Sequence, residues 1–120
     1  MGAWGDEPWD NDDAADWFAE LISPKFVKQI DVALRKDPED DYETVRAACY
    51  VLNVLGHNYI WPVDKLQPQL KLAVRALQQI LEAGVLEDEK VVRMVRKEMK
   101  SLSDRLKLLQ SVGDAGESAE

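Results

Sequence analysis

The chain has 120 residues, 46% of them hydrophobic and 32% charged, with a net charge of −8. This balance is typical of one globular domain and excludes a disordered chain. A single cysteine, Cys49, excludes a disulfide framework and favours a reducing, cytoplasmic location. The acidic charge argues against a nucleic-acid partner, and no run approaches the roughly 20 apolar residues of a membrane span.

Helical periodicity predicts the first two helices between residues 11 and 38. The first begins near Asn11 or Asp12, where a capping residue precedes an acidic first turn. The second begins at Ser23-Pro24, because serine is a preferred N-cap and proline suits the first helical position. Asp37-Pro38 ends it. The first helix carries its apolar residues at helical spacing: Ala14, Trp17, Phe18 and Leu21.

The third helix is predicted to open in the acidic run 39–43 and to end at Gly56, since glycine is common at helix C-termini. Residues 57–64 are predicted as a loop anchored by Trp61-Pro62.

The fourth helix is predicted to carry Pro68 in its first turn and to close at Gly84. The fifth begins near Glu87, and its apolar residues step by three and four, which predicts a heptad-like seam. The seam consists of Val92, Val95, Met99, Leu102, Leu106 and Leu109.

No run alternates with period two for long enough to predict a strand. The sequence therefore predicts an all-α fold, a single-domain bundle of about five helices over residues 1–112. An extended arm of residues 1–10, rich in tryptophan and glycine, is expected to pack on the bundle, and residues 113–120 are expected to form a disordered tail.

Charge is distributed unevenly along the chain. Residues 1–22 hold seven acids and no base, whereas residues 90–107 hold seven bases and two acids. In one interpretation the two ends lie close together and compensate each other. In the other, the molecule has a bipolar surface that attracts a charged partner.

The carboxylates between Asp10 and Glu20 raise the hypothesis of a calcium or magnesium site, because these ions prefer oxygen ligands. The calcium-loop template fails, since Ala15 stands where glycine is needed and Leu21 where glutamate is needed. A helix cap with an acidic first turn explains most of these residues. The sequence therefore predicts no metal ligand set and no cofactor.

No residue is predicted to be catalytic. His57 is the only histidine, and Cys49 lies about two turns before it on the apolar stripe of a helix, so a His–Cys dyad is disfavoured. No serine lies in a nucleophile elbow, and no glycine-rich phosphate loop is present.

Three of the four tryptophans, Trp4, Trp9 and Trp17, fall within the first 17 residues. They form either an aromatic patch for a partner, since tryptophan is enriched at binding hot spots, or a plug that folds back into the bundle. The plug is the favoured interpretation of Trp4 and Trp9, because the nearby glycines permit a close backbone approach.

The run Met1-Gly2-Ala3-Trp4-Gly5, followed by Asn-Asp-Asp-Ala-Ala-Asp-Trp over residues 11–17, resembles a family of small, mainly bacterial proteins of unknown function. Its members open with Met-Gly-x-Trp-Gly and continue with Asn-Asp-x-Ala-x-Asp-Trp. The resemblance is specific over residues 1–21 and implies a bacterial, cytoplasmic, α-helical protein with no assigned catalytic residue. It marks one N-terminal unit: Gly2, Trp4, Gly5, Asn11, Asp12, Asp16 and Trp17.

The leading hypothesis is a non-catalytic protein-binding module, immunity-like or regulatory. It would present Asp12, Asp16, Glu20 and Trp9 to another protein, a basic one by charge complementarity. The alternative is a divalent-metal-binding protein or hydrolase that uses the carboxylates between Asp10 and Glu20. The chain is expected to be a monomer, or a homodimer through its C-terminal helix.

Overall fold

The computed structural model describes residues 7–8, 11–57 and 60–118. Over these residues the chain forms five helices, which confirms the predicted all-α bundle. They are α1 (Asp12–Leu21), α2 (Pro24–Leu34), α3 (Tyr42–Leu55), α4 (Val63–Ala83) and α5 (Glu89–Ser118). The predicted arm of residues 1–10 lies almost wholly outside the described residues, and the division into arm, domain and tail stays a prediction.

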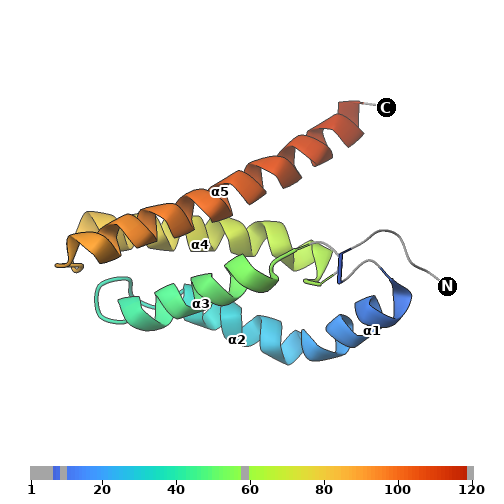
Figure 1. The fold of residues 1–120 in the computed structure, drawn as a ribbon, viewed down its shortest axis with the longest axis horizontal. Coiled ribbons are helices and arrows are strands. Elements are labelled where there is room, and N and C mark those ends of the chain that lie inside the picture. The colour runs from blue at the N-terminus through green and yellow to red at the C-terminus, as the bar shows by residue number, and fades with distance from the viewer. Residues whose placement is uncertain (1–6, 9–10, 58–59, 119–120) are drawn as a thin grey trace.

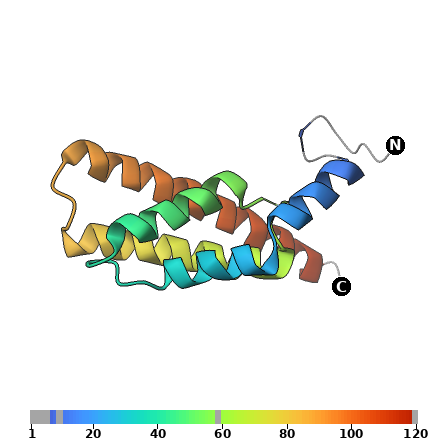
Figure 2. The ribbon, with the colours of Figure 1, turned by 90° about the horizontal axis from the view of Figure 1, so that it is seen from below.

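Two antiparallel hairpins, α2–α3 and α4–α5, lie side by side, with both connecting loops at the same end of the molecule (Figure 1). Helix α4 contacts α2, α3 and α5, so it is the central element of the bundle. Helix α1 lies at the opposite end, beyond the start of α2 (Figures 1 and 2). It is not packed along any other described helix.

The helix ends follow from local chemistry. Asn11 accepts a hydrogen bond from the Ala14 N–H at 2.8 Å and Ser23 accepts one from the Phe26 N–H at 3.3 Å, so both residues act as N-caps. Gly84 ends α4 with a φ of 69°, in the left-handed region that glycine adopts at low cost.

One predicted detail of the helices is wrong. Pro68 lies in the second turn of α4, because Trp61-Pro62 starts this helix at Val63. The carbonyl that loses its helical partner to Pro68 belongs to Asp64, an exposed residue, so the missing hydrogen bond does not fall in the core.

Helix α5 ends at Ser118. The helix continues through Gly113 and Gly116 to Ser118, because each glycine costs a helix only about 1 kcal/mol, which the flanking helical turns offset. The disorder predicted for residues 113–120 stays a prediction.

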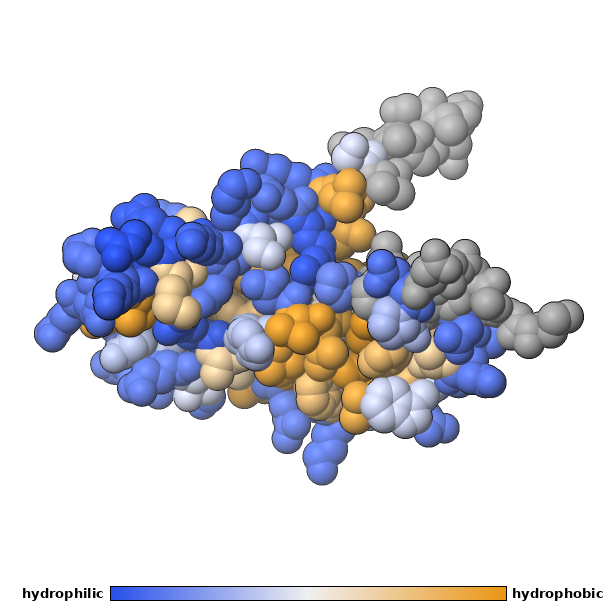
Figure 3. All heavy atoms as spheres, viewed as in Figure 1, coloured by the Kyte–Doolittle hydropathy of each residue, from blue (hydrophilic) through white to orange (hydrophobic). Residues whose placement is uncertain are grey.

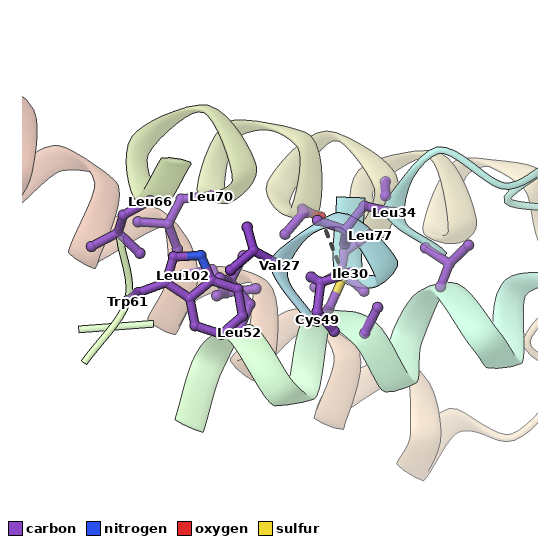
Figure 4. Close-up of a cluster of buried hydrophobic side chains, with 14 of the residues drawn as sticks. Val27, Ile30, Leu34, Cys49, Leu52, Trp61, Leu66, Leu70, Leu77 and Leu102 are labelled. Carbon is purple, nitrogen blue, oxygen red and sulfur yellow. Dashed lines mark hydrogen bonds between the residues drawn. The ribbon is translucent and has the colours of Figure 1, made fainter. Parts of the chain in front are cut away.

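The hydrophobic core is built around one face of α4, which contributes its buried residues at steps of three and four. Figure 4 shows Trp61 among leucines from three helices, Leu52, Leu66, Leu70 and Leu102, with Val27 of α2 beside it. Among the described residues, no helix combines the length and the apolar character needed to cross a membrane.

One buried polar side chain joins three parts of the chain. Gln69 of α4 is 1% exposed. Its Oε1 accepts a hydrogen bond from the indole N–H of Trp61 at 2.7 Å, and its Nε2 donates to the carbonyl of Val27 at 3.1 Å. Every polar atom of this side chain is therefore paired, which is the condition for burying an amide without a large penalty.

We predict that Gln69→Leu lowers the free energy of unfolding by about 1–3 kcal/mol, because it leaves the buried Trp61 N–H without an acceptor. Gln79→Leu is the matched control, since Gln79 is an exposed glutamine on the same helix and should shift stability by less than about 0.5 kcal/mol. Urea unfolding measures both variants. Equal stability of the two would contradict a structural role for the Gln69 hydrogen bonds.

The two helix-ending glycines give a second prediction. A Cβ on Gly56 would collide with the backbone oxygen of Leu52, whereas a Cβ on Gly84 would meet open space and suffer only from the positive φ. Gly84→Ala should therefore cost about 1–2 kcal/mol, and Gly56→Ala should cost more, because a helix backbone must move. Thermal unfolding of both variants tests this order, and the reverse order would refute it.

Candidate functional site

Helix α1 is attached to the bundle mainly at its C-terminal end. None of its residues is buried, but Phe18 packs against the core, and Ile22, directly after the helix, is 2% exposed. The Ile22 N–H bonds to the Phe18 carbonyl at 2.8 Å and closes the last turn. Among its other residues, Asp12, Asp13, Asp16, Trp17 and Glu20 are exposed.

The apolar residues predicted for one side of this helix do not share one environment. Phe18 packs against the core, whereas Trp17 is 59% exposed and Leu21 is 47% exposed. The Trp17 and Phe18 rings meet edge to face, with centroids 5.3 Å apart and planes at 72°. Trp17 therefore contacts the Phe18 ring but remains largely exposed to solvent. Figure 3 shows further apolar surface over the C-terminal half of α3, on the side facing α1.

The carboxylates of Asp12, Asp13, Asp16 and Glu20 are all exposed. Within the described part of the chain, the ion pairs are Arg35–Asp31, Arg46–Glu98 and Lys100–Asp104, none of which includes an α1 acid. Ion pairing between α1 and the basic α5 therefore does not compensate the acidic end among these residues. The negative charge of α1 faces solvent.

The metal hypothesis finds no ligand set in the described residues, where no three histidine, cysteine or acidic side chains gather closely enough to hold an ion. Asp12 and Glu20 are separated by about 12 Å of helix rise, whereas ligand oxygens lie about 2.0–2.6 Å from a calcium or magnesium ion. Asp10 lies outside the described residues.

The N-terminal unit is described only in part. Of its members, Gly2, Trp4 and Gly5 lie outside the described residues, as does Trp9, the partner-binding candidate that is not part of this unit. The remaining members are positioned by α1. Asn11 caps the helix, and Asp12, Asp16 and Trp17 project from it, exposed to solvent.

Cys49 and His57 do not form a catalytic pair. The Cys49 thiol is 1% exposed and donates to the carbonyl of Ala73 at 3.7 Å, inside the core (Figure 4). His57 follows the end of α3, about two turns further on. Burial, together with the charge of Arg105, lowers the pKa of His57, so the imidazole is held neutral near pH 7.

The predicted α5 seam is used within the chain. Val95 and Leu102 are fully buried, and α5 has its most extensive contacts with α4. The homodimer through this helix stays a prediction.

Two arginines form hydrogen bonds between α3 and α5 that local sequence patterns did not predict. The Arg46 guanidinium donates two hydrogen bonds to the Glu98 carboxylate, at 3.0 and 2.8 Å. Further along α5, Arg105 donates hydrogen bonds to the carbonyls of Leu52 and Gly56 at 3.3 and 3.2 Å and so caps the C-terminus of α3. Each pair is separated by about 50 residues, so no spacing rule could have found it.

The exposed acidic α1 and the compact four-helix body define the chain as a small all-α protein with one projecting helix. The chain belongs to the family described as a domain of unknown function (DUF4259), whose model matches residues 2–90. The match therefore runs through α1–α4 and ends in the first turn of α5. No curated protein and no solved structure matches the chain.

We predict that the Cys49 thiol does not react with dithionitrobenzoate at pH 8 in the folded protein and reacts promptly in urea. Burial, with a smaller contribution from Glu98, raises the pKa of Cys49 to about 12. Because the folded state holds the thiol neutral, its contribution to stability is lost as pH rises above the ordinary value of 9.0. Rapid labelling of native protein would show that this thiol is accessible.

Proposed function

We propose that the protein is a non-catalytic binding module, immunity-like or regulatory, that docks a basic protein on α1. The observation that carries the proposal is the exposure of Trp17 at 59% beside the carboxylates of Asp12, Asp16 and Glu20, which form no ion pair with another described residue. A large exposed aromatic residue costs a soluble protein solubility, and such residues concentrate at binding hot spots.

The two kinds of side chain divide the work of recognition. Exposed carboxylates steer a basic partner and raise its association rate, but each contributes little to affinity. Trp17 and Leu21 supply the apolar area that slows dissociation once the partner has docked. A rim of charge around an aromatic centre is the usual composition of such an interface.

The N-terminal motif enters the proposal as one unit. Gly2, Trp4 and Gly5 precede the capped start of α1 in the sequence, and Trp9 is the residue of this segment that we place in the interface. We assign the module to the bacterial cytoplasm, on the resemblance of its N-terminal motif and on its single cysteine.

The test is affinity capture from the lysate of the source cells. Wild type is compared with the triple variant Asp12→Lys, Asp16→Lys, Glu20→Lys and with Trp17→Ala, followed by mass spectrometry. We expect wild type to retain a basic protein, the triple variant to lose it, and Trp17→Ala to weaken retention at least about tenfold, as expected for a hot-spot aromatic residue.

The matched control is Glu39→Lys, Asp40→Lys, Glu82→Lys, which makes the same charge change on exposed acids at the opposite end of the bundle. This control should retain the partner. Equal loss of the partner by both triple variants would show that net charge, rather than the α1 surface, determines binding. Undiminished capture by the α1 variants would refute the proposed surface.

A further inference from the structure

A groove opens between the N-terminal half of α3 and the segment that links α4 to α5. Its volume is about 930 Å³, within the range of ligand-binding clefts. It lies at the end of the bundle opposite to α1, beside the α4–α5 connection in Figure 1. It is therefore separate from the surface proposed above.

The walls of the groove are apolar and aromatic. Tyr42 and Tyr50 line it from α3, and Val85, Leu86 and Val91 line it from the linking segment and α5. Tyr50 is 62% exposed, although it lies on a helix whose neighbouring turns are buried in the core. The groove thus presents one exposed tyrosine, Tyr50, beside half-buried residues that pack against the core: Tyr42, Val85, Leu86 and Val91.

The charges in the groove are predominantly negative. Glu43, Glu87 and Asp88 line it with exposed carboxylates, and the single base among its lining residues is Arg46. The Arg46 charge is already neutralised, because its guanidinium binds the Glu98 carboxylate through two hydrogen bonds. An incoming cation therefore meets carboxylates and no unneutralised positive charge on the lining.

We propose that this groove binds a short basic segment of a partner protein, whose arginine and lysine side chains lie along the groove, one beside Tyr42 and another beside Tyr50. The aliphatic stem of such a side chain matches the apolar walls. The cationic heads are attracted by the tyrosine rings and by the carboxylates of Glu43 and Glu87, which also line the groove. The inference rests on the proposed function only in taking a basic protein as the partner, since it names a different surface.

In the experiment, the isotope-labelled full chain is titrated with each of three capped tetrapeptides, and binding is measured from the shifts of its amide NMR signals. They are acetyl-Leu-Arg-Lys-Leu-amide and the analogues in which Gln-Gln or Glu-Glu replaces Arg-Lys. We expect the basic peptide alone to shift amides in the first half of α3 and around residues 85–91. Glu43→Gln with Glu87→Gln should weaken it about fivefold or more, and Tyr50→Ser should weaken it as well.

Glu39→Gln with Glu82→Gln removes the same charge outside the groove and should leave the affinity unchanged. Equal binding of the glutamine peptide, or of the Glu43/Glu87 variant, would overturn the inference. The α1 charge reversal separates the two proposals. If it abolishes the peptide shifts, the peptide binds α1, which overturns the groove and supports the α1 surface. If it leaves the shifts in the groove unchanged, the groove binds independently of α1.

Discussion

The buried indole of Trp61 needs a hydrogen-bond acceptor, and the position of Gln69 supplies one inside the core. An indole N–H left unpaired in an apolar interior carries a penalty of about 1–3 kcal/mol, so the loop before α4 is held where Gln69 can reach it at 2.7 Å. The same amide reaches across to the Val27 carbonyl of α2. These directional hydrogen bonds therefore fix the loop, α2 and α4 relative to one another. The leucines pack around them without directional preference.

This arrangement explains why α1 remains outside the bundle. The central face of α4 is filled by α2, α3 and α5, and the core ends at Ile22, immediately before the Ser23 cap of α2. Only Phe18 of α1 reaches the core. The exposure of Trp17 and Leu21 is thus a consequence of where the core ends. A helix held mainly at one end can also adjust its angle to a partner with little cost to the rest of the fold.

The sequence was informative wherever structure depends on neighbouring residues. The Asn11 and Ser23 caps and the stops at Gly56 and Gly84 predicted four helix ends, because a cap is satisfied within one turn. The sequence was uninformative wherever the environment of a residue depends on a contact with a residue far away in the chain. The apolar spacing of α1 placed Trp17 and Phe18 on one stripe, but only Phe18 has a core to meet. The Arg46–Glu98 pair and the groove around it join segments far apart in the sequence, and no local pattern reports such a contact.

The acidic and basic side chains lie on different parts of the molecule. The exposed bases Arg93, Arg96 and Lys97 of α5 repel a cationic protein, whereas the α1 acids attract it without competition from an intramolecular ion pair in the described chain. These fields extend over roughly 8 Å at physiological salt, less than the 50 Å length of the molecule. A basic protein near α1 is therefore attracted by the acids of that helix, and the α5 bases act only on a molecule that approaches their own exposed face.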